Sequence, residues 1–210
     1  GFAVKNNRGI VVSNVNDFVE LDVGNVRYGK DITINFNNKS IRLLTVHLKS
    51  GCFDLPIDPT SLTAMPEATV ANRKRKNACI KLEKQVAPLE SWVDARATED
   101  IPFVLLGDFN RRFLVEIRNQ YDETAGIWPA IDDPGNGNPN EDLYLANGDD
   151  VPSCWSSRFS SYIDQIVVDP RTLLNLQENS FNELVYDETD YNLFRKLTSD
   201  HCPLSIIINM

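Results

Sequence analysis

Residues 103–110 read FVLLGDFN, and this segment decides how the rest of the chain is interpreted. Its first four residues are apolar, which is typical of a short strand buried on both faces. Gly107 then lets the backbone turn, and Asp108 and Asn110 can project to one side because they lie two residues apart. Asp and Asn after a strand are usually only turn residues, so this segment indicates a functional site only in combination with other segments of the same kind.

Three other segments place titratable residues at the ends of apolar strands. Residues 45–50 read TVHLKS and carry His47 near the end of an apolar run. Residues 162–166 read YIDQI, and because a buried carboxylate needs a partner, we expect another residue to pair with Asp164. Residues 199–204 read SDHCPL and precede the last strand of the chain. Strand ends are where a rigid sheet can present catalytic groups to a cleft.

Each segment has an ordinary structural explanation, and a lone histidine at a strand end is more often a core residue than a catalyst. Together they point further, because the chain has only two histidines and both fall in these segments. Metal-assisted attack on a phosphodiester needs oxygen ligands for a cation, a group that activates or positions water, and donors for the charge that builds on phosphate. Three carboxylates, one asparagine and two histidines meet those needs.

The motifs GDFN, YIDQI and SDHCPL, in that order after a strand ending in HLKS, resemble those of the endonuclease/exonuclease/phosphatase superfamily, which includes deoxyribonuclease I. The resemblance runs from about Arg27 to the end of the chain. It implies an α/β fold, a sandwich of two packed mixed β-sheets flanked by helices, in a single domain over residues 1–210.

The resemblance also implies a function: metal-dependent hydrolysis of phosphodiester bonds, with a DNA endonuclease as the leading hypothesis. Two alternatives stay open. One is a lipid or sugar-phosphate phosphodiesterase or phosphatase of the same fold, and the other is a non-catalytic binding module. No stable protein partner is implied.

The resemblance assigns roles to the residues of the central motifs. Asp200 would bind the metal, and His201 would be the general base or a phosphate-contacting imidazole, held in its tautomer by Asp164. Asp108 and Asn110 would position the attacking water and the phosphate, with Asp108 as a further metal ligand. The implied cation is Mg²⁺, with Mn²⁺ or Ca²⁺ as alternatives.

Four more residues are assigned to substrate. His47 would contact the scissile phosphate and assist the leaving group. Arg27 lies where some members of the superfamily place a phosphate-contacting arginine, although a plain surface arginine explains it equally well. Arg111 and Arg112 follow Asn110 directly, and the forked guanidinium group suits phosphate.

The resemblance leaves one expected segment unmatched. Members of the superfamily begin with an Asn-bearing strand, a helix, and a strand that ends in a metal-binding glutamate. Gly1 to Val4 would follow that segment, so the chain is expected to lack the N-terminal strands and helix, roughly 60 to 80 residues of a typical domain. Glu20 and Asp22 lie on an early strand but outside the motif, so neither is assigned to the metal. The chain could therefore be inactive.

Composition restricts the class of protein. The formal net charge is -9, which argues against holding polyanions by charge alone but suits an enzyme that meets phosphate through a cation. The one basic block, residues 73–76, reads RKRK and is interpreted first as a solvated helix face, with a polyanion-facing patch as the alternative. No apolar run approaches the roughly 18 residues that cross a bilayer.

The cysteines leave two alternatives. Four cysteines without C-x-x-C spacing fit two disulfides in an exported protein, and four buried thiols fit the same sequence. If bridges form, we expect Cys52–Cys79 and Cys154–Cys202. No signal peptide is present, but SGC after His47, the double arginine and the cysteine of SDHCP resemble a bacterial exported subgroup, so a secreted or periplasmic location is expected.

Hydrophobic patterns predict the elements. Asn37 and Asn38 should form a hairpin turn between strands at residues 32–36 and 41–48. An amphipathic helix should start near Ala68, and Pro88 should kink or divide it. Further strands are expected at residues 9–13, 18–23, 162–168 and 204–208, and loops at residues 54–66 and 131–150.

Overall fold

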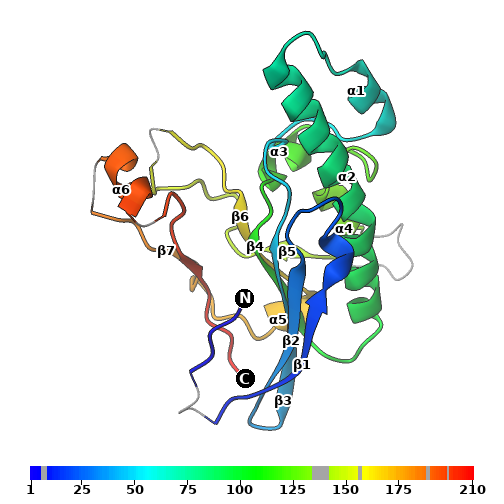
Figure 1. Cartoon of the computed structure of the whole chain (residues 1–210). Coiled ribbons are helices and arrows are strands. Elements are labelled where there is room, and N and C mark those ends of the chain that lie inside the picture. Colours follow the sequence, from blue (N-terminus) through cyan, green and yellow to red (C-terminus); the bar gives the residue numbers. More distant parts are fainter. Residues whose placement is uncertain (6–8, 134–141, 156–157, 188–189, 198) are drawn as a thin grey trace.

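The structure is a computed structural model of the chain, and it describes residues 1–5, 9–133, 142–155, 158–187, 190–197 and 199–210. A mixed six-stranded sheet and an antiparallel two-stranded sheet form its frame, and helices flank them (Figure 1). In spatial order the large sheet contains β1 (Val11–Phe18), β2 (Gly29–Phe36), β3 (Lys39–His47), β4 (Phe103–Asp108), β6 (Asp164–Val168) and β5 (Tyr144–Leu145). The small sheet pairs β7 (Asn182–Glu183) with β8 (Leu204–Ser205).

The β2–β3 hairpin confirms its prediction. Phe36 pairs with Lys39, and the two residues between them, Asn37 and Asn38, have φ angles of 49° and 61°. Two positive φ angles define the type I′ turn whose twist matches that of the flanking strands, and asparagine tolerates this conformation.

A long helix, α2 (Val70–Ala97), connects β3 to β4, and these two strands are parallel. It covers one face of the large sheet through buried residues such as Leu82, Leu89 and Trp92 (Figure 1). Pro88 lies inside α2 and does not divide it, so of the two expected outcomes, a kink or a division, the division does not occur. Proline removes one backbone hydrogen bond there, but the packing of the apolar stripe on both sides of it keeps the helix continuous.

The remaining helices are short. They are the 3₁₀ helix η2 (Val19–Leu21), α1 (Pro59–Ala64), α3 (Phe113–Arg118), α4 (Trp128–Ile131), α5 (Pro170–Leu173) and α6 (Tyr191–Leu197). A second apolar cluster, on the opposite face of the large sheet from α2, joins residues such as Ile41, Val104 and Ile166 to Leu204 and Ile208 near the end of the chain. The small sheet therefore packs on the large one, as the sandwich requires.

Several predicted boundaries were wrong. The strand expected at residues 18–23 contains η2 instead, and the loop expected at 54–66 contains α1, which Asp58 caps by accepting a hydrogen bond from the Ser61 amide. The last strand is shorter than expected, because beyond β8 only an isolated bridge joins Ile208 to Leu176.

The long loop expected at residues 131–150 is also partly wrong. Ile131 belongs to α4, and Tyr144 and Leu145 form β5, which pairs with β6. Residues 134–141 of that expected loop lie outside the described residues.

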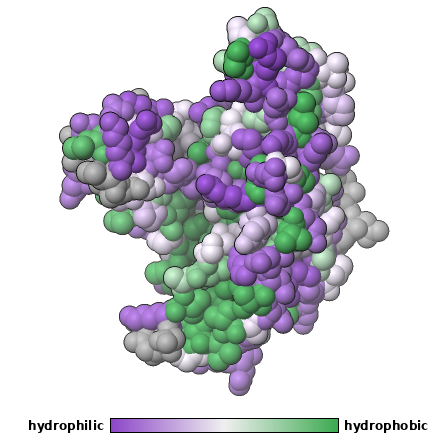
Figure 2. Space-filling model, viewed as in Figure 1, coloured by the Kyte–Doolittle hydropathy of each residue, from purple (hydrophilic) through white to green (hydrophobic). Residues whose placement is uncertain are grey.

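Two disulfides, Cys52–Cys79 and Cys154–Cys202, form with the expected pairing, and their Cα atoms lie 5.0 and 6.3 Å apart. The first ties the segment after β3 to α2, and the second ties the segment after β5 to the residue that follows His201. Among the described residues, no helix is both long and apolar enough to cross a bilayer. Hydrophilic residues cover much of the visible surface, and apolar residues gather at its lower end (Figure 2).

Candidate active site

A cleft of about 440 Å³ opens where the central strands β3 and β4 end and β6 begins. The strand register places its central residues side by side: His47 of β3 is paired with Asp108 of β4, and Asp108 is paired with Asp164 of β6. Because three neighbouring strands contribute one residue each, the row is set by backbone pairing and not by flexible loops.

His201 completes this row from the segment that precedes β8. Its Nδ1 lies 2.6 Å from Oδ2 of Asp164, so His201 is the partner that Asp164 was predicted to need, although this carboxylate is only partly buried, with a side chain that is 28% exposed. Its Nε2 lies 4.0 Å from Oδ2 of Asp108 and 3.8 Å from Oδ1 of Asp200. The hydrogen bond to Asp164 raises the pKa of His201 to about 9, so the imidazole carries a proton at neutral pH.

Asp108 is held in place by Asn110. The backbone amide of Asn110 donates to Oδ1 of Asp108 over 2.7 Å, and its side-chain amide donates to Oδ2 over 2.9 Å and to the Leu48 carbonyl over 3.1 Å. Asn110 is 3% exposed and has a φ of 51°, a conformation that asparagine adopts more readily than most residues. Burial and then the charge of Asp164 raise the pKa of Asp108 to about 6.

Gly107 lets β3 and β4 approach each other directly before Asp108. Its φ is 129°, and a Cβ atom there would lie 2.2 Å from the Val46 carbonyl oxygen. Only glycine fits this position, so Gly107 fixes where β4 presents the following aspartate.

His47 lies at the other end of the row, and Arg27 lies beside it. Nε2 of His47 lies 3.5 Å from Oδ2 of Asp108, and the Arg27 guanidinium contacts the His47 ring. Burial, followed by the positive charges of Arg27 and His201, lowers the pKa of His47. The two imidazoles of the cleft therefore have opposite pKa shifts, a pattern that separates proton-accepting from proton-donating groups in active sites.

The two consecutive arginines lie in different places. Arg112 lines the cleft, and its Nη1 donates to Asp54 over 3.0 Å. Arg111 does not reach the cleft: it has no exposed surface, forms an ion pair with buried Glu116, and donates to the carbonyls of Cys52 and Leu55 over 2.7 Å each. The assignment of Arg111 to substrate phosphates is therefore corrected, because its donors are already bound inside the protein.

Among the described residues, two groups of side chains bring possible metal-ligand atoms close together. In the first, Asp108, Asp164 and His201 each offer a ligand atom within 4.8 Å of the others. Carboxylate oxygens suit hard cations, and burial and the charge of Asp164 raise the pKa of Asp108, an effect that a cation would relieve, so the two carboxylates fit a divalent ion. The protonated imidazole of His201 offers no lone pair to a metal. Asp200 lines the same cleft with a side chain that is 52% exposed.

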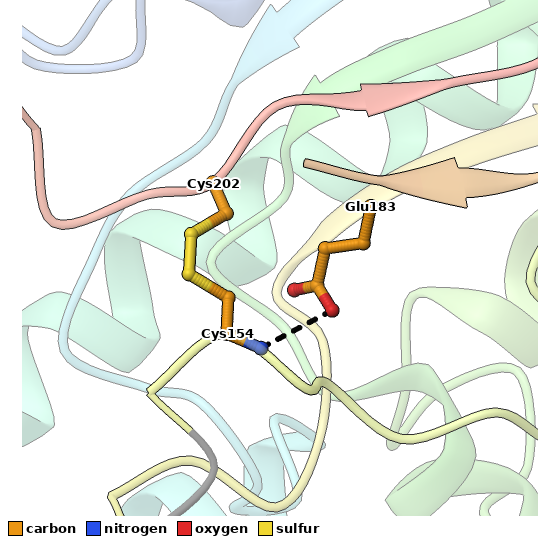
Figure 3. Close-up of side chains that lie close together, drawn as sticks. All are labelled: Cys154, Glu183 and Cys202. Carbon is orange, nitrogen blue, oxygen red and sulfur yellow. Dashed lines mark hydrogen bonds between the residues drawn. A yellow bond between two sulfur atoms is a disulfide. The ribbon is translucent and has the colours of Figure 1, made fainter. Parts of the chain in front are cut away.

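The second group, Cys154, Glu183 and Cys202, does not fit a metal. Figure 3 shows the two sulfur atoms bonded to each other, which leaves no thiolate to act as a ligand. Glu183 accepts hydrogen bonds from the amide of Cys154 over 3.3 Å and from that of Ser153 over 2.7 Å. Its role is to hold the segment after β5 against β7.

The sequence reasoning missed the aromatic side of the cleft. It is lined by Phe53, Trp155, Phe159 and Tyr191, and the ring of Tyr191 packs against those of Trp155 and Phe159. These residues come from segments without periodicity, so no sequence signal marked them. The cleft brings together all of the residues assigned from the sequence except Arg111: Arg27, His47, Asp108, Asn110, Arg112, Asp164, Asp200 and His201.

The fold and the row of strand-end residues define the class of protein. Neither a scan of protein-family models nor a search of curated proteins finds a match to the sequence. Among solved structures, a humanized TDP2 from D. rerio shares 14% sequence identity and a TM-score of 0.50 over 96% of this chain and 66% of that one. The chain therefore has the deoxyribonuclease I-like α/β fold.

Two further structures are similar at lower TM-scores. The human Nocturnin catalytic domain, with a bound sulfate anion, has 13% identity and a TM-score of 0.45, over 96% of this chain and 61% of that one. The 3'-5' exonuclease NExo from Neisseria meningitidis has 15% identity and a TM-score of 0.47, over 95% of this chain and 72% of that one. The chain thus spans less than two thirds of the length of Nocturnin and of TDP2.

Proposed function

We propose that this chain belongs to a divalent-metal-dependent phosphodiesterase that cleaves DNA as an endonuclease. The observation that carries the proposal is the row of His47, Asp108 and Asp164 on three adjacent strands, with His201 bonded to Asp164 beside it. Sequence motifs and strand register converge on the same residues, and those residue types are the ones that phosphodiester hydrolysis uses.

Each residue has a role that follows from its position. Asp164 orients His201, so that its Nε2 faces the cleft and can donate to a phosphate oxygen. Asp108, held by Asn110, accepts a hydrogen bond from the attacking water. His47, on the far side of Asp108, contacts the same phosphate and assists the leaving oxygen. Arg27 and Arg112 supply positive charge at the edges of the cleft.

Asp108 and Asp200 would hold the cation in this proposal, with Mg²⁺ as the first choice and Mn²⁺ or Ca²⁺ as alternatives. Bound there, it would polarise the phosphate and stabilise the charge that develops on it. The two disulfides support a secreted or periplasmic location, since such bonds persist in oxidising compartments.

The test is nicking of supercoiled plasmid with Mg²⁺ or Mn²⁺. We expect nicking that a chelator abolishes and that Asp108→Ala lowers by at least about 100-fold, as loss of a positioned acid or base does. Asp149→Ala is the matched control, because Asp149 is exposed and does not line the cleft. Equal nicking by the wild type and Asp108→Ala would contradict the assigned site.

Thermal melting separates the remaining alternatives. A melting temperature raised by Mg²⁺, and no longer raised in Asp200→Ala, argues against a non-catalytic module. If the cation binds but plasmid stays intact, the endonuclease proposal fails. The aromatic side of the cleft then favours a phospholipid or sugar-phosphate ester, which would place an apolar or ring-shaped group beside Trp155 and Tyr191.

A further inference from the structure

The basic block at residues 73–76 lies beside the cleft in the folded chain. It occupies the first two turns of α2, and Arg73, Lys74 and Arg75 are exposed there. Asp54 joins this helix end to the cleft: one of its oxygens lies 3.5 Å from Arg75, and the other lies 3.0 Å from Arg112, which lines the cleft. We call Arg73, Lys74, Arg75 and Arg112 the basic ridge.

The first disulfide fixes the position of the ridge. Cys79, one turn after Arg75 on α2, is bonded to Cys52, which precedes Phe53 and Asp54. The carbonyl of Phe53 accepts the backbone amide of Arg112 over 2.9 Å, so the same short segment is anchored to both ends of the ridge. The spacing between the helix end and the cleft is therefore built into the fold and does not depend on a free loop.

The positive charge of the ridge indicates an anionic ligand. The contributing segments, residues 52–54, residues 67–76 and Arg112, carry five basic side chains and two carboxylates, Asp54 and Glu67. That excess of three positive charges stands on a chain whose formal net charge is -9. The negative net charge of the chain disfavours the approach of a polyanion elsewhere, so the cationic path that leads from Arg75 to Arg112 is the favoured route for a strand. Figure 2 shows mainly hydrophilic residues over this end of the molecule.

We propose that the basic ridge binds the backbone phosphates of a DNA strand on one side of the scissile phosphate. This inference rests on the proposed function for the identity of the strand, and it extends the binding surface from Arg112 in the cleft to the start of α2. Asp54 contacts both Arg75 and Arg112, so the two guanidinium groups lie side by side and can meet neighbouring phosphates of one strand. Arg73 and Lys74 extend the path along α2.

Fluorescence anisotropy with a labelled DNA duplex of about 20 base pairs, two helical turns, tests the ridge in chelator, where no cleavage interferes. The variant is the triple substitution Arg73→Ala, Lys74→Ala and Arg75→Ala. Each side chain that binds a phosphate should contribute roughly 5- to 10-fold to the affinity near 0.1 M salt and about 0.9 to the slope of log K against log salt. The triple variant should lose this contribution for each of the three side chains that contacts a phosphate. Alanine favours helix, so the melting temperature should stay close to that of the wild type.

Lys84→Ala is the matched control. Lys84 is exposed on α2 nine residues after Arg75, about 13 Å further along the helix axis and on its other side. It should change neither affinity nor salt slope. The proposal is overturned if the triple variant binds the duplex like this control. A parallel measurement with anionic phosphatidylglycerol vesicles also overturns it if the triple variant keeps its affinity for the duplex and loses only its binding to the vesicles. Because binding is measured without metal, a wild type that binds DNA but does not nick plasmid leaves the ridge intact and refutes only the endonuclease.

Discussion

Replacing Arg111 with alanine separates a structural arginine from a substrate-binding one. The residue lies in the same motif as Arg112, yet both it and its partner Glu116 have no exposed side-chain surface. Glu116 also accepts the backbone amide of Trp128 over 2.7 Å, and so it ties the start of α4 to this buried pair. Removing the guanidinium leaves a buried carboxylate without its countercharge and two backbone carbonyls, those of Cys52 and Leu55, without their donor.

The size of the effect follows from that burial. Breaking a buried ion pair by removing one partner costs about 3–5 kcal/mol. For a chain of this length each kcal/mol shifts the melting temperature by about 2–4 °C, so Arg111→Ala should melt about 6–20 °C lower than the wild type. Replacing both Arg111 and Glu116 with methionine leaves no unpaired buried charge, so this double variant should recover part of the stability that Arg111→Ala loses.

The assay is a thermal melt of the wild type, Arg111→Ala, Arg112→Ala and the double variant, alongside DNA affinity. Arg112, with a side chain that is 31% exposed, should lose affinity with little change in melting. If Arg111→Ala instead melts like the wild type and only its DNA affinity falls, the buried assignment of Arg111 is refuted and the original sequence prediction returns.

Three further predictions follow from the geometry. Gly107→Ala should destabilise the chain by several kcal/mol, on the order of 2–4, because a Cβ would overlap the Val46 carbonyl; chemical denaturation measures it, and a loss under about 0.5 kcal/mol would contradict the close approach. Burial raises the pKa of Asp132 from 3.8 to about 6, so the stability that its protonated form contributes below pH 4 is lost as the pH rises through 6. Asp132→Asn should remove this pH dependence of the unfolding free energy and add about 1 kcal/mol at pH 8 after solvent screening, as urea titrations from pH 4 to 8 would show. Asp164→Asn should lower the kcat of nicking by about 10²–10⁴ with KM little changed, since His201 loses its orienting partner; a change in KM alone would contradict that role.

Sequence reasoning succeeded where a local requirement has few solutions. A carboxylate in an apolar strand needs a partner, and the resemblance implied His201 as the partner of Asp164, a pairing that the structure confirms. The Asn37–Asn38 turn was predictable for the same reason, since few residue pairs adopt its backbone angles.

It failed where the outcome depends on which distant segments meet. Arg111 and Arg112 are identical in type and adjacent in sequence. What buries Arg111 is a set of acceptors from residues 52–55 and 125 and the carboxylate of Glu116, and no local pattern brings these together. The exposed helix face expected at residues 73–76 is present, but its nearness to the cleft could not be predicted, because that depends on the Cys52–Cys79 bond and on Asp54.

The four residues GDFN show why a short motif can carry so much of a site. Gly107 is required because β4 passes too close to the Val46 carbonyl for any side chain. Phe109 is fully buried and packs edge-on against Phe113, with ring centroids 5.0 Å apart, so it fixes the turn after β4 to the core. Asn110 then returns to hold both oxygens of Asp108. Three of the four residues thus serve to place the fourth, and a change at any of them should move Asp108 relative to the neighbouring strands before it alters any charge in the cleft.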